Sequence, residues 1–248
     1  MNLFQVIIIG FVEGITEFLP ISSTAHMSIT KTLLGIPDIN FTVPFEISLQ
    51  FGAILSVLVY FYSDFLNIDT IKKLIITTIP TAIIGFVFKD YLTDWINNLH
   101  IISYSLIIGG IAILISEHFY KYNNLIITNK KSFMLGLFQG IAVLPGVSRS
   151  GAMLVLGKAL GISKEELFKY TFLAAVPIMG LATAYSILRH YSEIANSLNY
   201  TDVIIGSLVS FITALFVIKS LMFLIRKIDF KFFGIYRIIV GVIILFVL

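Results

Sequence analysis

The sequence has no cysteine and few charged residues. Charged residues make up 12% of its 248 positions, whereas 58% are hydrophobic, and the mean hydropathy is +0.97. The lack of cysteine excludes disulfides and thiolate metal sites. The shortage of charge leaves too little polar surface to cover a water-soluble globule. The sequence therefore predicts an all-α polytopic membrane protein that forms a single membrane domain, residues 1–248.

Six apolar stretches are each long enough, at about 20 residues, to cross a membrane as a helix. They are roughly Phe41–Tyr62, Ile71–Phe88, Ile101–Phe119, Phe168–Leu188, Val203–Leu224 and Phe232–Leu248. Two further apolar regions, Leu3–Leu34 and Phe133–Leu160, are interrupted by proline and polar residues. Each predicts two short helices around a break. Broken backbone at membrane depth is tolerated only inside protein or beside a watery cavity, so we expect two re-entrant helix hairpins.

The two interrupted regions also resemble each other. Gly10–Pro20 aligns with Gly136–Pro145 if one residue is skipped. This similarity predicts an internal repeat with halves at approximately 1–120 and 131–248, each a hairpin followed by three spans. Because three is odd, the second hairpin enters from the opposite side. The repeats are then inverted, and their breaks meet near the middle of the membrane.

Basic residues lie at the ends of the predicted spans, mostly on one side. This distribution favours membrane topology over nucleic-acid binding as the reason for the net charge of +3, so we expect no nucleic-acid partner. By the positive-inside rule the lysine-rich side is cytoplasmic. The prediction is a multi-pass plasma-membrane protein with both termini on the outer side and a site that opens outward.

A polar cluster between Glu13 and His26 lies in the first interrupted region. Glu13 and Glu17 are four residues apart and share a helix face. Two buried carboxylates need a positive partner, and Arg149, in the break of the other repeat, is the expected one. One arginine leaves room for a divalent cation or a proton. The alternative is an ion pair that only locks the hairpins together.

Hydroxyl residues follow both breaks, as Ser22–Thr24 and Ser148–Ser150, and both segments are expected to begin helices. Helix N-termini present unpaired N–H groups and a positive dipole end. Two of them converging on Arg149 would bind an anion with several oxygens, such as phosphate. The alternative is that these hydroxyls only cap buried helix ends.

His26 lies over the same expected helical turn as Ser22 and Ser23. Several mechanisms are compatible with this spacing: Ser23 attacks phosphorus with Glu17 or His26 as the base, His26 is itself the nucleophile, or Glu17 activates a water. Outside the cluster, Lys158 could add positive potential to the anion pocket or extend to the cytoplasmic interface, and the second is favoured. Arg237, inside the last span, is expected to pair with a carboxylate or with backbone carbonyls.

The motifs Glu13–His26 and Pro145–Ala152 resemble the two signature motifs of the undecaprenyl-diphosphate phosphatase family, which is named for bacitracin resistance. The similarity continues through Gln50–Ile54, Ala174–Pro177 and Phe233–Arg237, so it covers nearly the whole chain. The resemblance implies an integral membrane hydrolase that removes the terminal phosphate of undecaprenyl diphosphate. Its product would be the lipid carrier for cell-envelope glycan synthesis.

When the family's roles are transferred to the matching motif positions, the resemblance assigns roles to residues in both halves of the repeat. Catalysis falls to Glu17, Ser23, His26 and Arg149, and substrate binding is predicted for Glu13, Ser22, Thr24, Ser148 and Ser150. The family is described as needing a divalent cation, and we expect Mg²⁺ or Ca²⁺ at Glu13 and Glu17. Ala25 departs from the glycine that the family usually has there. The expected partners are the polyprenyl diphosphate and membrane lipids, with a homodimer left open.

Two other functions can be compared with the sequence. A different lipid-phosphatase superfamily carries a histidine and an aspartate after its Ser-Arg pair, but this chain has Val155 and Ala159 at those positions. Inverted repeats with broken helices are also typical of transporters, so a carrier that flips a polyprenyl phosphate is the alternative function.

Overall fold

The computed structural model describes residues 1–37, 42–91, 95, 98–189 and 199–247. Within them the chain is helical, and its β-structure is one isolated bridge between Leu125 and Ile162. The α-helices are α1 (Leu3–Thr16), α2 (Ser23–Leu33), α3 (Thr42–Tyr60), α4 (Ile68–Phe88), α6 (Leu99–Phe119), α7 (Asn129–Gly140), α8 (Arg149–Ala159), α9 (Lys164–Arg189), α11 (Tyr200–Leu224) and α12 (Lys231–Val247). The prediction of an all-α protein is confirmed.

Four helices, α4, α6, α9 and α11, are long and apolar enough to cross a membrane. Their outward faces carry large apolar side chains, among them Phe216 and Phe223, which would be unfavourable in water. These features make the chain a membrane protein. The other two predicted spans correspond to shorter helices, α3 with 19 residues and α12 with 17. The predicted span ends Phe41 and Leu248 lie outside the described residues.

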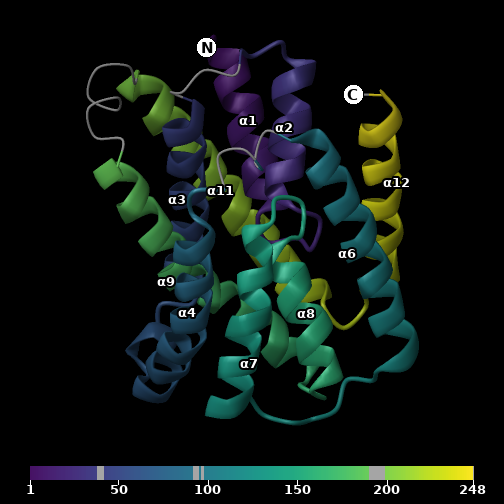
Figure 1. The fold of residues 1–248 in the computed structure, drawn as a ribbon. Coiled ribbons are helices and arrows are strands. Elements are labelled where there is room, and N and C mark those ends of the chain that lie inside the picture. The colour runs from purple at the N-terminus through teal and green to yellow at the C-terminus, as the bar shows by residue number, and fades with distance from the viewer. Residues whose placement is uncertain (38–41, 92–94, 96–97, 190–198, 248) are drawn as a thin grey trace.

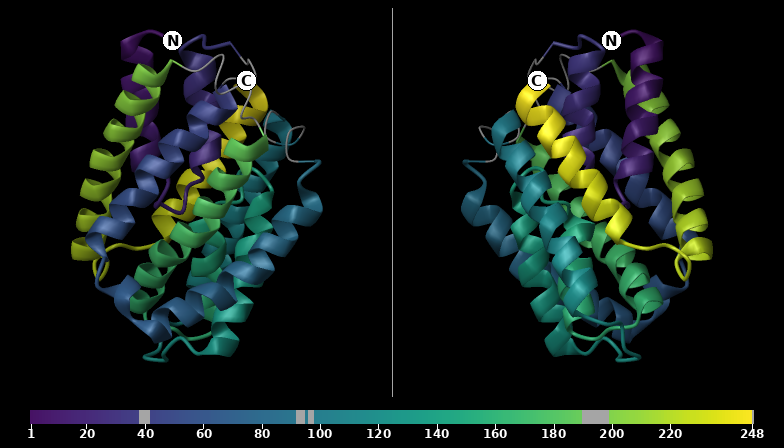
Figure 2. Two further views of the ribbon diagram at one scale, coloured as in Figure 1. Left: turned by 90° about the vertical axis from the view of Figure 1, so that its left-hand side faces the viewer. Right: turned by 90° about the vertical axis from the view of Figure 1, so that its right-hand side faces the viewer.

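Each interrupted region folds into two short helices around a break, as predicted. Helices α1 and α2 extend from the end of the molecule that holds both termini, whereas α7 and α8 extend from the opposite end (Figures 1 and 2). The two breaks meet in the middle of the molecule, where Arg149 of the second contacts Glu17 of the first. Glu17 and Arg149 therefore lie between the two ends of the molecule, enclosed by surrounding helices.

The packing of one half recurs in the other. Helix α1 packs on α11, and correspondingly α7 packs on α4. Helix α3 packs on its counterpart α9, and α6 packs on α12. Glycines allow the close approaches: a Cβ on Gly10 would meet the backbone of α11 at Gly206, and a Cβ on Gly136 would meet the backbone of α4 at Thr77.

The backbone of the two breaks also matches. Ser22 (φ 73°) and Ser148 (φ 67°) are the non-glycine residues with positive φ in the described part of the chain, and each caps the following helix. Gly35 and Gly161, which follow α2 and α8, also have positive φ. Ser148 lies as many residues after Ser22 as Gly161 lies after Gly35. The two halves therefore align without skipping a residue. In this alignment Pro20 and Pro145 do not occupy equivalent positions.

We expect Gly52→Ala to destabilise the protein. A Cβ at Gly52 on α3 would overlap the carbonyl oxygen of Ser207 on α11, and neither backbone can move without repacking two helices. The expected loss is about 1–3 kcal/mol, the usual cost of overpacking a core. Thermal unfolding in detergent measures it. Gly180→Ala is the matched control, because a Cβ there meets no atom within 4 Å; equal melting of both variants would contradict this packing.

Candidate functional site

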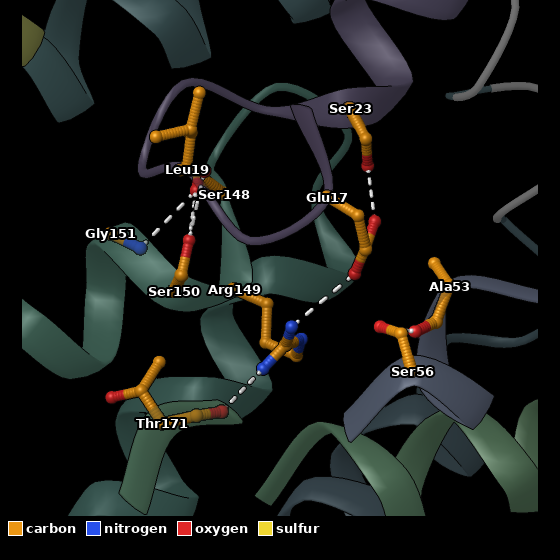
Figure 3. Close-up of polar contacts among 10 residues, drawn as sticks. All are labelled: Glu17, Leu19, Ser23, Ala53, Ser56, Ser148, Arg149, Ser150, Gly151 and Thr171. Atoms are coloured by element: carbon orange, nitrogen blue, oxygen red, sulfur yellow. Dashed lines mark hydrogen bonds and ion pairs between the residues drawn. The ribbon is translucent and has the colours of Figure 1, made fainter. Parts of the chain in front are cut away.

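The carboxylate of Glu17 connects the two breaks (Figure 3). Ser23 Oγ, at the start of α2, donates a hydrogen bond of 2.6 Å to Glu17 Oε2. Arg149 Nη2, at the start of α8, donates one of 3.3 Å to Glu17 Oε1. A single carboxylate thus binds a hydroxyl from its own hairpin and a guanidinium from the other one. The structure thus brings Glu17, Ser23 and Arg149 into contact, as the sequence predicted.

The guanidinium of Arg149 is largely buried and only partly satisfied. Its Nη1 donates to the carbonyl oxygen of Thr171 on α9 at 2.9 Å. Its Nε is buried and has no hydrogen-bond partner among the described residues. A buried donor without a partner is costly. This N–H is therefore available to an oxygen-rich anion that enters between the two helix starts.

The hydroxyls at the helix starts make internal contacts. Ser22 Oγ accepts from the backbone N–H of Ala25 at 3.4 Å, and Ser148 Oγ accepts from that of Gly151 at 3.2 Å. Ser150 Oγ donates to the carbonyl of Leu19 at 3.1 Å and so links the second helix start to the first break. The contacts of Ser22 and Ser148 are those expected if these hydroxyls only cap buried helix ends. Thr24 lies half-buried in the first turn of α2, and binding of substrate by these four hydroxyls stays a prediction.

Arg237 on α12 holds both breaks together, a role that the sequence did not reveal. Of its two expected kinds of partner, backbone carbonyls are the ones found. The fully buried guanidinium donates to the carbonyl oxygens of Pro20 (3.1 Å), Ser105 (3.2 Å), Leu106 (3.4 Å), Gly146 (2.9 Å) and Val147 (3.0 Å). The sequence marked Arg237 only as an arginine inside an apolar span, where a charge is costly to bury.

His26 is fixed between two hydrogen bonds. Its Nδ1 lies 2.8 Å from the carbonyl oxygen of Ser22, which can only accept, so Nδ1 carries the proton. In the neutral ring Nε2 then accepts from the hydroxyl of Tyr236 at 2.7 Å. The lone pair of His26 thus faces Tyr236, whereas the base bonded to Ser23 is Glu17. Tyr236 was missed because nothing in the sequence brings α12 next to α2.

For the diphosphatase activity that the sequence resemblance implies, we expect Tyr236→Phe to lower turnover about three- to tenfold, because the hydrogen bond that fixes the lone pair of His26 is worth about 0.5–1.5 kcal/mol. Initial rates of phosphate release from a polyprenyl diphosphate measure the effect. The matched control is Tyr62→Phe, which removes a hydroxyl from an exposed tyrosine. If both variants turned over like the parent, the contact between Tyr236 and His26 would have no part in the reaction.

Glu13 is buried beside the site without a counter-charge. Its side chain is 1% exposed, and no donor among the described residues reaches either carboxylate oxygen. The acidic groups of Glu17 and Glu46 lie nearby. Such an arrangement fits a cation. No group of three histidine or acidic side chains in the described part of the chain forms a complete metal site, so Glu13 and Glu17 can supply only part of a coordination shell.

Lys158 lies away from this site and reaches the end of the molecule away from the termini, but its side chain is buried and paired there. Its side chain is 5% exposed, and its Nζ lies 2.6 Å from Glu117 Oε1. The ammonium group also lies over the ring of Tyr122, 4.8 Å from the centroid. A carboxylate from α6, invisible in the local sequence, offsets the cost of burying the charge.

Comparisons with known proteins cover almost the whole chain. The sequence model of the family described as bacitracin resistance protein BacA matches residues 6–243. The chain is similar to proteins named undecaprenyl-diphosphatase. It is 42% identical to the one from Bdellovibrio bacteriovorus, over 100% of this chain and 97% of that protein. It is 38% identical to the one from Aquifex aeolicus, over 98% and 97% of the two chains. The protein from Wolinella succinogenes is 39% identical, over 100% and 99%.

Proposed function

The chain belongs to the family of the bacitracin resistance protein BacA, and from this premise we propose that it hydrolyses undecaprenyl diphosphate to the monophosphate and inorganic phosphate. Its relatives bear the name of that enzyme. The observation that carries the proposal is the contact of Ser23 and Arg149 with the single carboxylate of Glu17. The reaction regenerates the lipid carrier for cell-envelope glycan synthesis and lowers sensitivity to bacitracin.

The diphosphate binds between the two helix starts. The buried Nε of Arg149, which has no partner among the described residues, donates to the terminal phosphate. Backbone N–H groups at the starts of α2 and α8, together with the hydroxyls of the predicted binding residues, surround the remaining oxygens. The break lies at half depth, so the phosphates reach it from the lipid interface while the prenyl tail stays in the bilayer.

Ser23 is the proposed nucleophile and Glu17 its base. Glu17 takes the proton of Ser23 Oγ, the Oγ–P bond forms, and the P–O bond to undecaprenyl phosphate breaks, with its electron pair leaving on that product. Glu17 passes that proton to the departing undecaprenyl phosphate and is a free carboxylate again. A water then gives a proton to Glu17 while its oxygen bonds to phosphorus, and the Ser23 Oγ–P bond breaks with its electron pair on Oγ, which takes the proton from Glu17. Arg149 stabilises charge on the phosphoryl oxygens. His26, whose lone pair faces Tyr236, positions the first turn of α2.

A divalent cation, Mg²⁺ or Ca²⁺, would be held by Glu13 and Glu17 together with diphosphate oxygens. When bound it would supply positive charge to the phosphates. We expect a chelator to abolish turnover and either cation to restore it. Changes even to outer-shell partners of metal ligands lower metal affinity about 10–100-fold, so Glu13→Gln, a change to a proposed ligand, should raise the cation concentration needed for half-maximal rate by at least about tenfold. Glu165→Gln, at an exposed carboxylate far from the site, is the control. Full activity in chelator would contradict the cation.

The membrane arrangement that we propose has six transmembrane helices and two re-entrant hairpins in an inverted repeat of residues 1–120 and 131–248. The matching serine caps and helix contacts support it. Both termini, together on one end of the molecule (Figure 2), would lie outside the plasma membrane with the site opening outward. Because the chain has no cysteine, single cysteines near each end would report their side by labelling with an impermeant reagent. A homodimer stays a prediction, since one chain supplies the whole site.

Hydrolysis is separated from lipid flipping by an assay without compartments. Purified protein in detergent is expected to release phosphate from undecaprenyl diphosphate. The flippase alternative is not favoured, because the relatives are named as diphosphatases. It would be supported instead if detergent samples released no phosphate while vesicles containing the protein moved polyprenyl phosphate between leaflets.

A further inference from the structure

A second polar cavity lies at the end of the molecule away from the termini, where the chain passes from α6 towards α7 and from α11 to α12. Its volume is about 480 Å³. Lysines line it from the start of α9, the end of α8, the start of α12, the segment after α6 and the segment between α11 and α12. The lining residues are Glu117, Tyr120, Lys121, Tyr122, Lys158, Lys164, Lys227, Ile228, Asp229 and Lys231.

The positive charge of this lysine cavity is not balanced. Its two carboxylates are already engaged, since Glu117 pairs with Lys158 and Asp229 Oδ1 accepts from the backbone N–H of Lys231 at 2.9 Å. Besides Lys164, three lining lysines have ammonium groups with no ion-pair partner in the ranges that the structure describes. They are Lys121, Lys227 and Lys231.

Other groups add donors and positive potential to the same space. Helices α9 and α12 begin at the cavity, so the positive ends of their dipoles face it. Lys164 Nζ is held by the carbonyl oxygen of Ile228 at 2.5 Å. Burial, and secondarily the charge of Glu117, raises the pKa of the Tyr122 phenol. Tyr122 therefore keeps its proton and can donate a hydrogen bond.

The lysine cavity is separate from the site at Glu17. Lys158 is nine residues beyond Arg149 on α8, which places it roughly 14 Å further along the helix. Between them lies a narrow cavity that shares Glu117 and Tyr122 with the lysine cavity and is also lined by Pro20. Its free space is about 10 Å³, room for about one water. A phosphate cannot pass between the two sites through it.

We propose that the lysine cavity is a second anion site, which binds a phosphate dianion independently of the reaction centre. Unpaired ammonium groups, a phenol and two helix starts are the donors that phosphate oxygens accept from. The cavity is larger than orthophosphate alone, so the dianion can be free phosphate or the phosphomonoester head of an anionic lipid. Either one would place its charge among Lys121, Lys227 and Lys231.

The first test titrates inorganic phosphate into the full-length protein in detergent at constant ionic strength, by calorimetry. An Arg149→Ala background weakens binding at the reaction centre, and we expect a phosphate site to persist in it. Adding Lys227→Gln and Lys231→Gln should weaken that site at least about tenfold. The matched control adds Lys72→Gln and Lys130→Gln, the same charge change at exposed lysines outside the cavity, and leaves binding unchanged.

The second test uses nanodiscs of phosphatidylcholine with or without phosphatidic acid and measures the melting temperature. Stabilisation by phosphatidic acid that is lost with Lys227→Gln and Lys231→Gln supports a lipid headgroup, whereas a response only to inorganic phosphate supports the free anion. Lys227→Arg with Lys231→Arg should retain binding and shows that folding is intact. The proposal is overturned if neither ligand responds to the cavity variants, or if the control variants lose binding equally.

Discussion

Replacing Arg149 by alanine is expected to lower kcat/KM about 10³-fold or more, because the buried guanidinium supplies the positive charge that meets the phosphoryl oxygens. The variant loses the contact with Glu17 and the unpartnered Nε donor together. Arg149→Lys should recover only a small part of the rate, since an ammonium group cannot bind Glu17, the carbonyl of Thr171 and a phosphate in the same fork. Initial rates with saturating and limiting substrate separate kcat from KM.

The same replacement also leaves the carboxylate of Glu17, like that of Glu13, buried without a counter-charge, so some loss of stability is expected. A paired substitution separates the two effects. Glu17→Gln with Arg149→Met removes both charges and should melt close to the parent protein, yet it should be inactive. If the paired variant recovered activity along with stability, the ion pair would only lock the hairpins, which is the alternative considered from the sequence.

Arg237→Met is expected to cause the largest loss of stability in the molecule. The substitution conserves much of the volume but leaves carbonyls of both breaks, including those of Pro20 and Gly146, without donors in a buried place. Removing one partner from a buried charged network costs about 3–5 kcal/mol. We also expect little activity in the protein that still folds, because the helix starts at Ser23 and Arg149 depend on the two breaks staying in register.

Thermal unfolding in detergent, together with yield of folded protein, measures the effect of Arg237→Met. Arg226→Gln is the control, because Arg226 is exposed and the carboxylate it pairs with, that of Glu165, is exposed too; such surface pairs contribute about 0–1 kcal/mol. Parent-like melting of Arg237→Met would show that other contacts hold the breaks together.

The breaks and the central contact of the site could be predicted from the sequence. Polar residues are expensive inside an apolar chain, so Glu17 and Arg149 stand out there as functional residues would. Proline and serine after an apolar run also mark the start of a new helix. The convergence of the breaks followed from counting spans between similar segments. These inferences depend on patterns of residues near each other in the chain, which a sequence displays.

The remaining contacts could not be predicted, because they join distant segments through partners that leave no pattern. Arg237 binds backbone carbonyls, and every residue has one. Tyr236 meets His26 only because α12 crosses the first hairpin. The buried ion pair of Lys158 was not predicted because its partner, Glu117, comes from another helix. Each case required knowledge of which helices pack together.

The equal spacing between Ser22 and Ser148 and between Gly35 and Gly161 is what tandem duplication of an ancestral gene would leave. At that spacing, however, chemically unlike residues occupy equivalent places: Ser23 corresponds to Arg149, and His26 to Ala152. A dimer of identical ancestral halves would have carried two serines or two arginines there, never one of each. Fusion into one chain would allow the copies to diverge, so that one half carries Glu17 and Ser23 while the other carries Arg149.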